Sequence, residues 1–179
     1  MAIKLDQIKS FLDAREIKYF DAPKHNASVH LVYGDDDFTG YVKIELEEDG
    51  ELIQFYCNEI IEDEPLKVKD HKYQLVVLQY LLDKNYKEKF GTWELDPKDG
   101  EVRFAVEIPL EDNTLTEKQF DRILRRTLGT QENFEEIHQI LKTGELPEDD
   151  LEKLALMAKL IEMQRKLEAL EGKGDDDGI

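Results

Sequence analysis

Two residue types on which many active sites depend are scarce in this sequence. It contains one cysteine, Cys57, and two serines, Ser10 and Ser28. A single cysteine excludes an internal disulfide and a multi-cysteine zinc site, and it suits a reducing compartment. Neither serine lies in a G-x-S-x-G elbow, and no glycine-rich phosphate-binding loop is present. Because Cys57 follows Ile53 and Phe55 in an alternating strand pattern, we interpret it as a core residue rather than a nucleophile.

Long apolar runs and positive charge are also scarce. No stretch approaches the ~20 apolar residues that span a bilayer, and the first residues carry charges every few positions, unlike a signal peptide. The chain has 24 lysines and arginines against 42 aspartates and glutamates, a formal net charge of −18. Such a charge repels phosphate backbones and anionic lipids, so we expect no nucleic-acid or membrane partner. These features together favour a cytoplasmic protein.

Carboxylates are plentiful, but their spacing does not predict a metal centre. An order of ligands like that of an EF-hand begins at Asp35 and continues with Asp37 and Gly40. Its twelfth position is Leu46, where a bidentate glutamate is needed, so we interpret the segment as a solvated acidic turn. The four histidines have no metal-ligand spacing and are His25, His30, His71 and His138. We expect no metal or other cofactor.

What the sequence does contain is strand and helix periodicity. Residues 41–57 predict a β-hairpin in which Asp49-Gly50 is typical of a two-residue turn. Residues 93–108 predict a second hairpin around DPKDG, which ends at Pro109 because proline lacks an amide donor. Residues 17–34 have strand composition but are interrupted, and they predict one strand or two.

Helical spacing of apolar residues predicts helices on either side of these hairpins. One is expected at 3–15, and another at 73–86 is expected to bury a leucine stripe. That stripe consists of Leu75, Leu78, Leu81 and Leu82. Thr116 and Gln119 have the spacing of a capping box for a third helix, which should end at Gly129 in the left-handed conformation.

Two more helices are expected after this point, from Thr130 to Gly144 and from Pro147 onward. The fold class predicted is α+β, an antiparallel sheet of about five strands with helices packed on one face, plus a C-terminal helical extension. We assign residues 1–129 to the α+β domain, 130–171 to a helical extension of the same domain, and 172–179 to a disordered acidic tail.

Two sets of residues are candidates for contact with other proteins. The first is an apolar seam with a 4, 3, 4, 3 spacing in the last helix: Leu156, Leu160, Met163, Leu167 and Leu170. It could fold onto its own domain, join two copies, or bind a separate helix. The second is a basic stripe on the third helix: Lys118, Arg122, Arg125 and Arg126. It could neutralise the protein's own carboxylates or dock an acidic segment.

The order of elements and one local motif carry a resemblance to a known family. The motif is WELDPKDGEVRFAVEIPLEDNTLTEKQF, and the leucine-rich helix LVVLQYLLDKN precedes it. Together they resemble the YbjN-like family, whose domain looks like the fold of type III secretion chaperones. The resemblance covers about residues 1–130, and its distinctive part runs from Leu75 to Phe120. The two helices after residue 130 depart from the pattern.

The resemblance implies a non-enzymatic domain, commonly dimeric, that binds protein segments or has a regulatory role. It supplies no catalytic residues. Our leading hypothesis is therefore a chaperone-like or regulatory protein-binding domain that forms a homodimer. The alternative is a small-ligand binder or enzyme with carboxylate chemistry in a cleft between sheet and helices. Because the chain has 42 acidic residues, the sequence does not single out a pair of catalytic carboxylates.

Overall fold

The computed structural model describes residues 2–21, 27–147, 159 and 162–164. The chain divides into two compact units, Met1–Glu145 and Leu146–Ile179. The first unit is built on one antiparallel sheet with the order β1-β2-β3-β4-β7-β6, and β5 pairs with β4. Its strands are β1 (Phe20–Asp21), β2 (Ser28–Gly34), β3 (Thr39–Glu47), β4 (Leu52–Ile61), β5 (Glu64–Pro65), β6 (Thr92–Leu95) and β7 (Val102–Pro109). Its helices are α1 (Leu5–Asp13), α2 (Gln74–Lys87), α3 (Glu117–Leu128) and α4 (Gln131–Thr143), with a 3-10 turn η1 (Glu48–Gly50).

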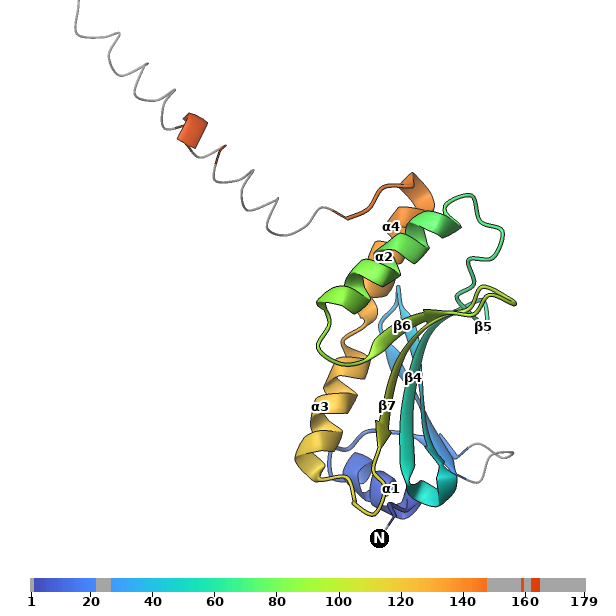
Figure 1. Ribbon diagram of the computed structural model, residues 1–179, viewed down its shortest axis with the longest axis vertical. Coiled ribbons are helices and arrows are strands. Elements are labelled where there is room, and N and C mark those ends of the chain that lie inside the picture. Colours follow the sequence, from blue (N-terminus) through green and yellow to red (C-terminus); the bar gives the residue numbers. More distant parts are fainter. Residues whose placement is uncertain (1, 22–26, 148–158, 160–161, 165–179) are drawn as a thin grey trace, which may run out of the picture. The chain divides into compact units, whose positions relative to one another are not determined.

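The helices cover one face of the sheet, as strand alternation predicts. Val42 pairs with Cys57 and Ile44 pairs with Phe55, and all four side chains are buried on the same face. The α3 helix runs along this face over β3, β4 and β7, while α2 and α4 lie side by side at one end (Figure 1). The α+β prediction is therefore confirmed, and the two additional strands, β1 and β5, are two residues long each.

Aromatic side chains join the helices to the sheet. The ring of Trp93 on β6 lies 5.3 Å from that of Phe104 on β7 and 5.1 Å from that of Phe134 on α4. On the other side of the core, Phe55 and Phe120 have ring centroids 5.9 Å apart. Each such side chain contributes on the order of 1.5–3 kcal/mol through burial, so α3 and α4 are integral parts of the fold.

The connection between β3 and β4 differs from the predicted two-residue turn. Glu47 pairs with Leu52, so four residues connect the strands, and Asp49 and Gly50 have φ of 55° and 94°. The carbonyl of Gly50 accepts a hydrogen bond from the amide of Ile3 at 3.2 Å, which anchors the chain leading into α1. A residue with a Cβ at position 50 would meet that segment at 2.2 Å, so the long-range contact fixes the wider turn.

The junction between α3 and α4 also differs from the sequence expectation. The capping box of Thr116 and Gln119 is present, and α3 ends at Leu128 as predicted. Gly129, however, has φ of −80° rather than the left-handed conformation, which occurs instead at Gly144 with φ of 77°. The Thr130 hydroxyl does not cap α4, and it donates to the carbonyl oxygen of Thr127 at 2.9 Å.

The C-terminal predictions fall largely outside the described part of the chain. Lys159 and residues 162–164 are helical, and Met163 is 63% exposed. The start of the helix after Pro147 and the tail at 172–179 are not described. Among the described helices, none has the length and apolarity to cross a membrane.

Candidate functional site

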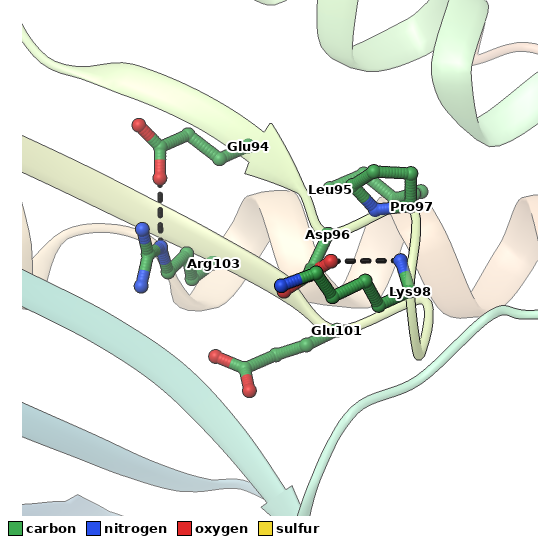
Figure 2. Close-up of a pocket in the computed structure, with 7 residues that line it drawn as sticks. All are labelled: Glu94, Leu95, Asp96, Pro97, Lys98, Glu101 and Arg103. Carbon is green, nitrogen blue, oxygen red and sulfur yellow. Dashed lines mark hydrogen bonds and ion pairs between the residues drawn. The ribbon is translucent and has the colours of Figure 1, made fainter.

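A hollow of about 410 Å³ lies at the turn of the β6–β7 hairpin, and several charged residues line it. Figure 2 shows two interactions between the residues that line it, Arg103 with Glu94 and Lys98 with Asp96. The Nε of Arg103 donates to Glu94 at 2.7 Å, and the amide of Lys98 donates to Asp96 at 2.7 Å. Glu101 accepts a hydrogen bond from Asn58 at 2.8 Å. These bonds hold the hairpin and its turn together, and each of the three carboxylates has a hydrogen-bond donor as its partner.

The acidic turn at Asp35 is also held by its own hydrogen bonds. One carboxylate oxygen accepts from the amides of Asp37 and Phe38 at 3.1 Å each, and the other accepts from Gln131 at 3.1 Å. The hydrogen bond from Gln131 is the main reason why the pKa of Asp35 is lowered. Across residues 2–21 and 27–147, no group of three or more histidine, cysteine, aspartate or glutamate side chains is placed to hold a metal ion.

Cys57 is fully buried in a hydroxyl network. Its sulfur lies 3.2 Å from the Tyr33 hydroxyl and 3.3 Å from the Thr130 hydroxyl, and those two hydroxyls are 3.1 Å apart. Burial raises the pKa of the Cys57 thiol, so the reactive thiolate is disfavoured. This network explains why Thr130 does not cap α4, and it agrees with the interpretation of Cys57 as a core residue.

The α2 helix carries the largest departure from the sequence expectation. Three of the four leucines predicted to be buried are exposed: Leu75 by 79%, Leu78 by 39% and Leu82 by 72%. Tyr86 extends the same stripe and is 91% exposed. Leu81 alone of the predicted stripe is buried. We call the four exposed side chains Leu75, Leu78, Leu82 and Tyr86 the α2 apolar face.

The opposite side of α2 is held firmly to the unit. Val77, Tyr80 and Leu81 are buried, and the Tyr80 hydroxyl donates to Glu136 on α4. Lys84 also pairs with Glu136, at 2.7 Å. These contacts fix which side of α2 turns inward, and they leave the α2 apolar face turned outward.

Asn85 holds the end of α2 to the edge of the sheet. Its side-chain oxygen accepts from the amide of Trp93 at 2.6 Å, and its nitrogen donates to the carbonyl of Trp93 at 2.9 Å. Trp93 lies on β6, the outermost strand on this side of the sheet. Asn85 therefore occupies backbone groups that an edge strand otherwise leaves open to another chain.

The four residues of the predicted basic stripe on α3 lie in different environments. Arg126 pairs with Glu88 and stacks over the ring of Phe104, with its guanidinium carbon 4.4 Å from the ring centroid. Arg125 is 82% exposed in its side chain and approaches Asp121 at 3.8 Å. Arg126 thus neutralises one of the protein's own carboxylates, whereas Lys118, Arg122 and Arg125 remain exposed.

Arg122 lines a second hollow, which we call the β7 groove. It has a volume of about 580 Å³ and lies between α3, the end of β7 and the loop after α2. Its lining residues are Lys89, Phe90, Gly91, Val106, Glu107, Ile108, Gln119, Arg122 and Ile123. Most of the exposed lining is apolar, with one cation from the loop and one from α3 at its sides.

The apolar seam predicted near the C-terminal end lies mostly outside the described residues. Met163 is the one member that the structure describes, and it is exposed. The other four members lie outside the described residues, so the seam stays a prediction. What sequence periodicity missed is the α2 apolar face and the β7 groove. The polar residues Asn85 and Lys84 on the inner side of α2 were the available signal for the helix orientation.

Comparison with protein families shows to which family this chain is similar. The YbjN family model, described as "Putative bacterial sensory transduction regulator", matches residues 4–137. A search of curated proteins found no match. The matched range runs from α1 into α4, so it contains both the α2 apolar face and the β7 groove.

Proposed function

Since this chain belongs to the YbjN family, as its resemblance to that family predicted, we propose that it is a non-enzymatic regulatory domain that binds protein segments and pairs with a second copy of itself. The observation that carries the proposal is the α2 apolar face. Four large apolar side chains stand in one row on a helix whose other side is anchored by a buried tyrosine and an ion pair. An apolar row of this kind typically marks an interaction surface.

The spacing along α2 favours a second copy as the occupant. If the outer sides of two α2 helices meet antiparallel about a two-fold axis that crosses α2 at the level of residues 79–81, Leu78 of each copy faces Leu82 of the other. Leu75 then faces Tyr86 of the other copy. A two-fold pair uses the same surface twice, so a self-complementary row is what such a dimer requires.

Charge also favours pairing at this place. The segment from Leu66 to Trp93 has six lysines and three acidic residues, in a chain with a net charge of −18. On α2 itself, Lys87 pairs with Asp83 at 2.9 Å and Lys84 pairs with Glu136 at 2.7 Å. Two acidic molecules can therefore approach here without the repulsion that the rest of their surface creates.

The expected strength follows from the size of this surface. Eight apolar side chains from two copies contribute at most about 12–24 kcal/mol of gross transfer free energy at ~1.5–3 kcal/mol each. Association costs about 4–15 kcal/mol before side chains are ordered. We therefore expect a dimer that dissociates on dilution rather than an obligate one.

Light scattering over a concentration series tests this proposal. The wild type should change from the dimer mass to the monomer mass on dilution, and the variant Leu78→Glu/Leu82→Glu should stay monomeric throughout. Val32→Glu is the matched control, because Val32 is also exposed, by 58%, but lies on β2. The control should dimerise like the wild type. A Leu78→Glu/Leu82→Glu variant with the wild-type mass profile would overturn the assignment to α2.

The apolar seam of the C-terminal segment remains a second proposed contact, for a partner helix or for the second copy. A chain that ends at Gly144 keeps the whole sheet and α1–α4 within the compact unit Met1–Glu145, short of its last residue. If α2 joins the copies, this shortened chain should dimerise. If it is monomeric while the Leu78→Glu/Leu82→Glu variant dimerises, the seam Leu156, Leu160, Met163, Leu167 and Leu170 joins the copies instead.

A further inference from the structure

The β7 groove lies where the edge of the sheet is left uncovered. The last residue of β7 that pairs with β6 is Ala105, opposite Thr92, while β7 itself continues to Pro109. On its other side β7 remains paired with β4 as far as Pro109. Val106–Pro109 therefore has one paired edge and one edge that β6 does not reach.

Successive residues of a strand direct their backbone N–H and C=O groups to alternate sides, and the hydrogen bonds along β7 show which residues face the uncovered edge. The amides of Val102 and Leu110 donate to carbonyls on the β4 side, those of Leu66 and Glu51. The carbonyl of Glu101 accepts from Asp96, toward β6. The backbone N–H and C=O groups of odd-numbered β7 residues thus point toward β6. Those of Glu107 point into the space beyond Thr92, where β6 is absent. Pro109 has no N–H, so the edge available for pairing is short.

The contrast with β6 shows why this edge is open. On β6 the outward amide and carbonyl of Trp93 are occupied by Asn85. Gly91, whose φ is 83°, comes directly before the first residue of β6, Thr92, and two residues before Trp93. A Cβ at this position would lie 2.1 Å from the Phe104 ring, so the turn depends on glycine. Beside the edge of β7, the chain before Gly91 supplies a groove wall rather than a strand.

The walls of the groove define what could lie against this edge. Val106 and Ile123 are almost fully buried beneath it, and Phe90 and Ile108 are partly buried at its surface. Lys89 stands on the loop side and Arg122 on the α3 side. Glu107 accepts from Gln54 at 2.6 Å and from Tyr56 at 2.9 Å, both on β4, so its carboxylate is engaged over the opposite face.

We propose that the β7 groove binds a short extended peptide segment that is acidic and carries a large apolar side chain. The segment pairs with the N–H and C=O of Glu107 in place of a longer β6, as in recognition by strand addition. Its apolar side chain lies on Ile108 and Phe90, and its carboxylates face Arg122 and Lys89. The inference deepens the proposed binding function by naming the class of partner, and it does not depend on dimerisation.

The probe for this site is a fluorescein-labelled peptide of about nine residues in which aspartates and glutamates flank a single central leucine. In a strand, residues two positions apart point to the same side, so the acidic residues two before and two after the leucine share the groove side with it. Wild-type protein should bind it saturably in fluorescence anisotropy. Arg122→Glu should weaken binding at least about tenfold, because a favourable charge pair becomes a repulsive one.

Three controls distinguish strand addition in the groove from non-specific electrostatic attraction between the acidic peptide and basic residues. Arg125→Glu changes the same charge on the same helix outside the groove, and it should leave the affinity within about twofold of wild type. A peptide with lysine in place of its acidic residues should not bind. A peptide N-methylated along one edge should lose binding, because strand pairing needs its amide donors. In the NMR spectrum of the protein, the amide of Glu107 should shift on addition of the acidic peptide.

The proposal is overturned by any of three results. These are absence of saturable binding, equal weakening by Arg122→Glu and Arg125→Glu, or shifts that avoid Glu107 and map to the α2 apolar face or the opposite face of the sheet. The mass of Arg122→Glu in solution should equal that of wild type. Failure of peptide binding with an intact dimer therefore counts against the groove alone and not against pairing through α2.

Discussion

At the scale of single residues, Arg15 shows how charged side chains tie distant parts of the chain together. Its guanidinium donates to Asp121 and, at 3.0 Å, to Glu117, both on α3. It also lies over the ring of Phe120, with its central carbon 5.5 Å from the ring centroid. The end of α1 is thus held to the start of α3. No periodicity in the sequence identifies this partner, because the residues are more than a hundred positions apart.

This contact predicts a pH dependence of stability. The hydrogen bond from Arg15 is the main reason why the pKa of Asp121 is lowered from 3.8, with a smaller contribution from Arg125. A carboxyl whose pKa is lower in the folded state stabilises the fold above its unfolded pKa, and this stabilisation is lost as pH falls through the folded value. Asp121→Asn should therefore remove part of the stability loss that the wild type shows below about pH 4.

Urea unfolding at a series of pH values measures this difference, and carbon-detected NMR titration measures the pKa of Asp121 directly. Arg15→Gln should raise that pKa more than Arg125→Gln does, because the Arg125 guanidinium approaches Asp121 only at 3.8 Å. Equal shifts from the two variants would contradict the assignment of Arg15 as the main cause.

At the scale of elements, the sequence predicts a strand or helix well when its apolar residues mark one side clearly. It fails when both sides of a helix carry apolar residues and either could be the buried one. The hairpins at β3–β4 and β6–β7 follow from alternation, because every second residue along most of β3 and β4 is buried, as are Val102, Phe104 and Val106 on β7. For α2 the leucine stripe suggested the wrong buried side. Tyr80 and Lys84 turn inward because Glu136 on α4 is placed to bind both. That partner comes from another part of the chain, so periodicity within α2 could not reveal it.

The same limit applies to the candidate sites. Spacing along α3 predicted a stripe of four basic residues, yet Arg126 turns inward to Glu88 and the ring of Phe104. The β7 groove arises because β6 begins at Thr92, opposite Ala105, and so does not reach the end of β7 at Pro109. The position at which β6 begins depends on Gly91 and its close approach to the ring of Phe104. The alternation of residues within the strand does not reveal that contact.

The start of α3 offers a prediction for a capped helix. The hydroxyl of Thr116 accepts from the amide of Gln119 at 3.3 Å, and the Gln119 side chain accepts from the amide of Thr116 at 2.9 Å. Thr116→Ala should lower the free energy of unfolding by about 1 kcal/mol, within a range of about 0.5–2 kcal/mol. Lys118→Ala, in the same exposed turn, should change it by less than about 0.5 kcal/mol. Urea titration of both variants checks this, and equal effects would mean that the cap contributes nothing specific.

At the scale of the whole molecule, a net charge of −18 keeps most surfaces of two copies apart. The α2 apolar face lies in the segment where lysines outnumber acidic residues, and its helix is rigidly held from behind by α4. The YbjN family match covers this segment entirely. Charge, packing and family membership together support a regulatory domain that acts through contacts with proteins, with α2 as the surface between copies.

The position of Gln79 allows the most direct measurement of that claim. Gln79 is exposed and lies beside the proposed two-fold axis, so the two copies of this residue should be close enough for a disulfide, which requires Cβ atoms about 3.5–4.5 Å apart. Cys57, the one native cysteine, is buried and does not compete. Gln79→Cys should therefore form a covalent dimer under mild oxidation. Gln139→Cys, at an exposed position on α4, is the matched control and should stay monomeric. A Gln79→Cys protein that stays monomeric, or equal cross-linking of the two variants, would contradict pairing through the α2 apolar face.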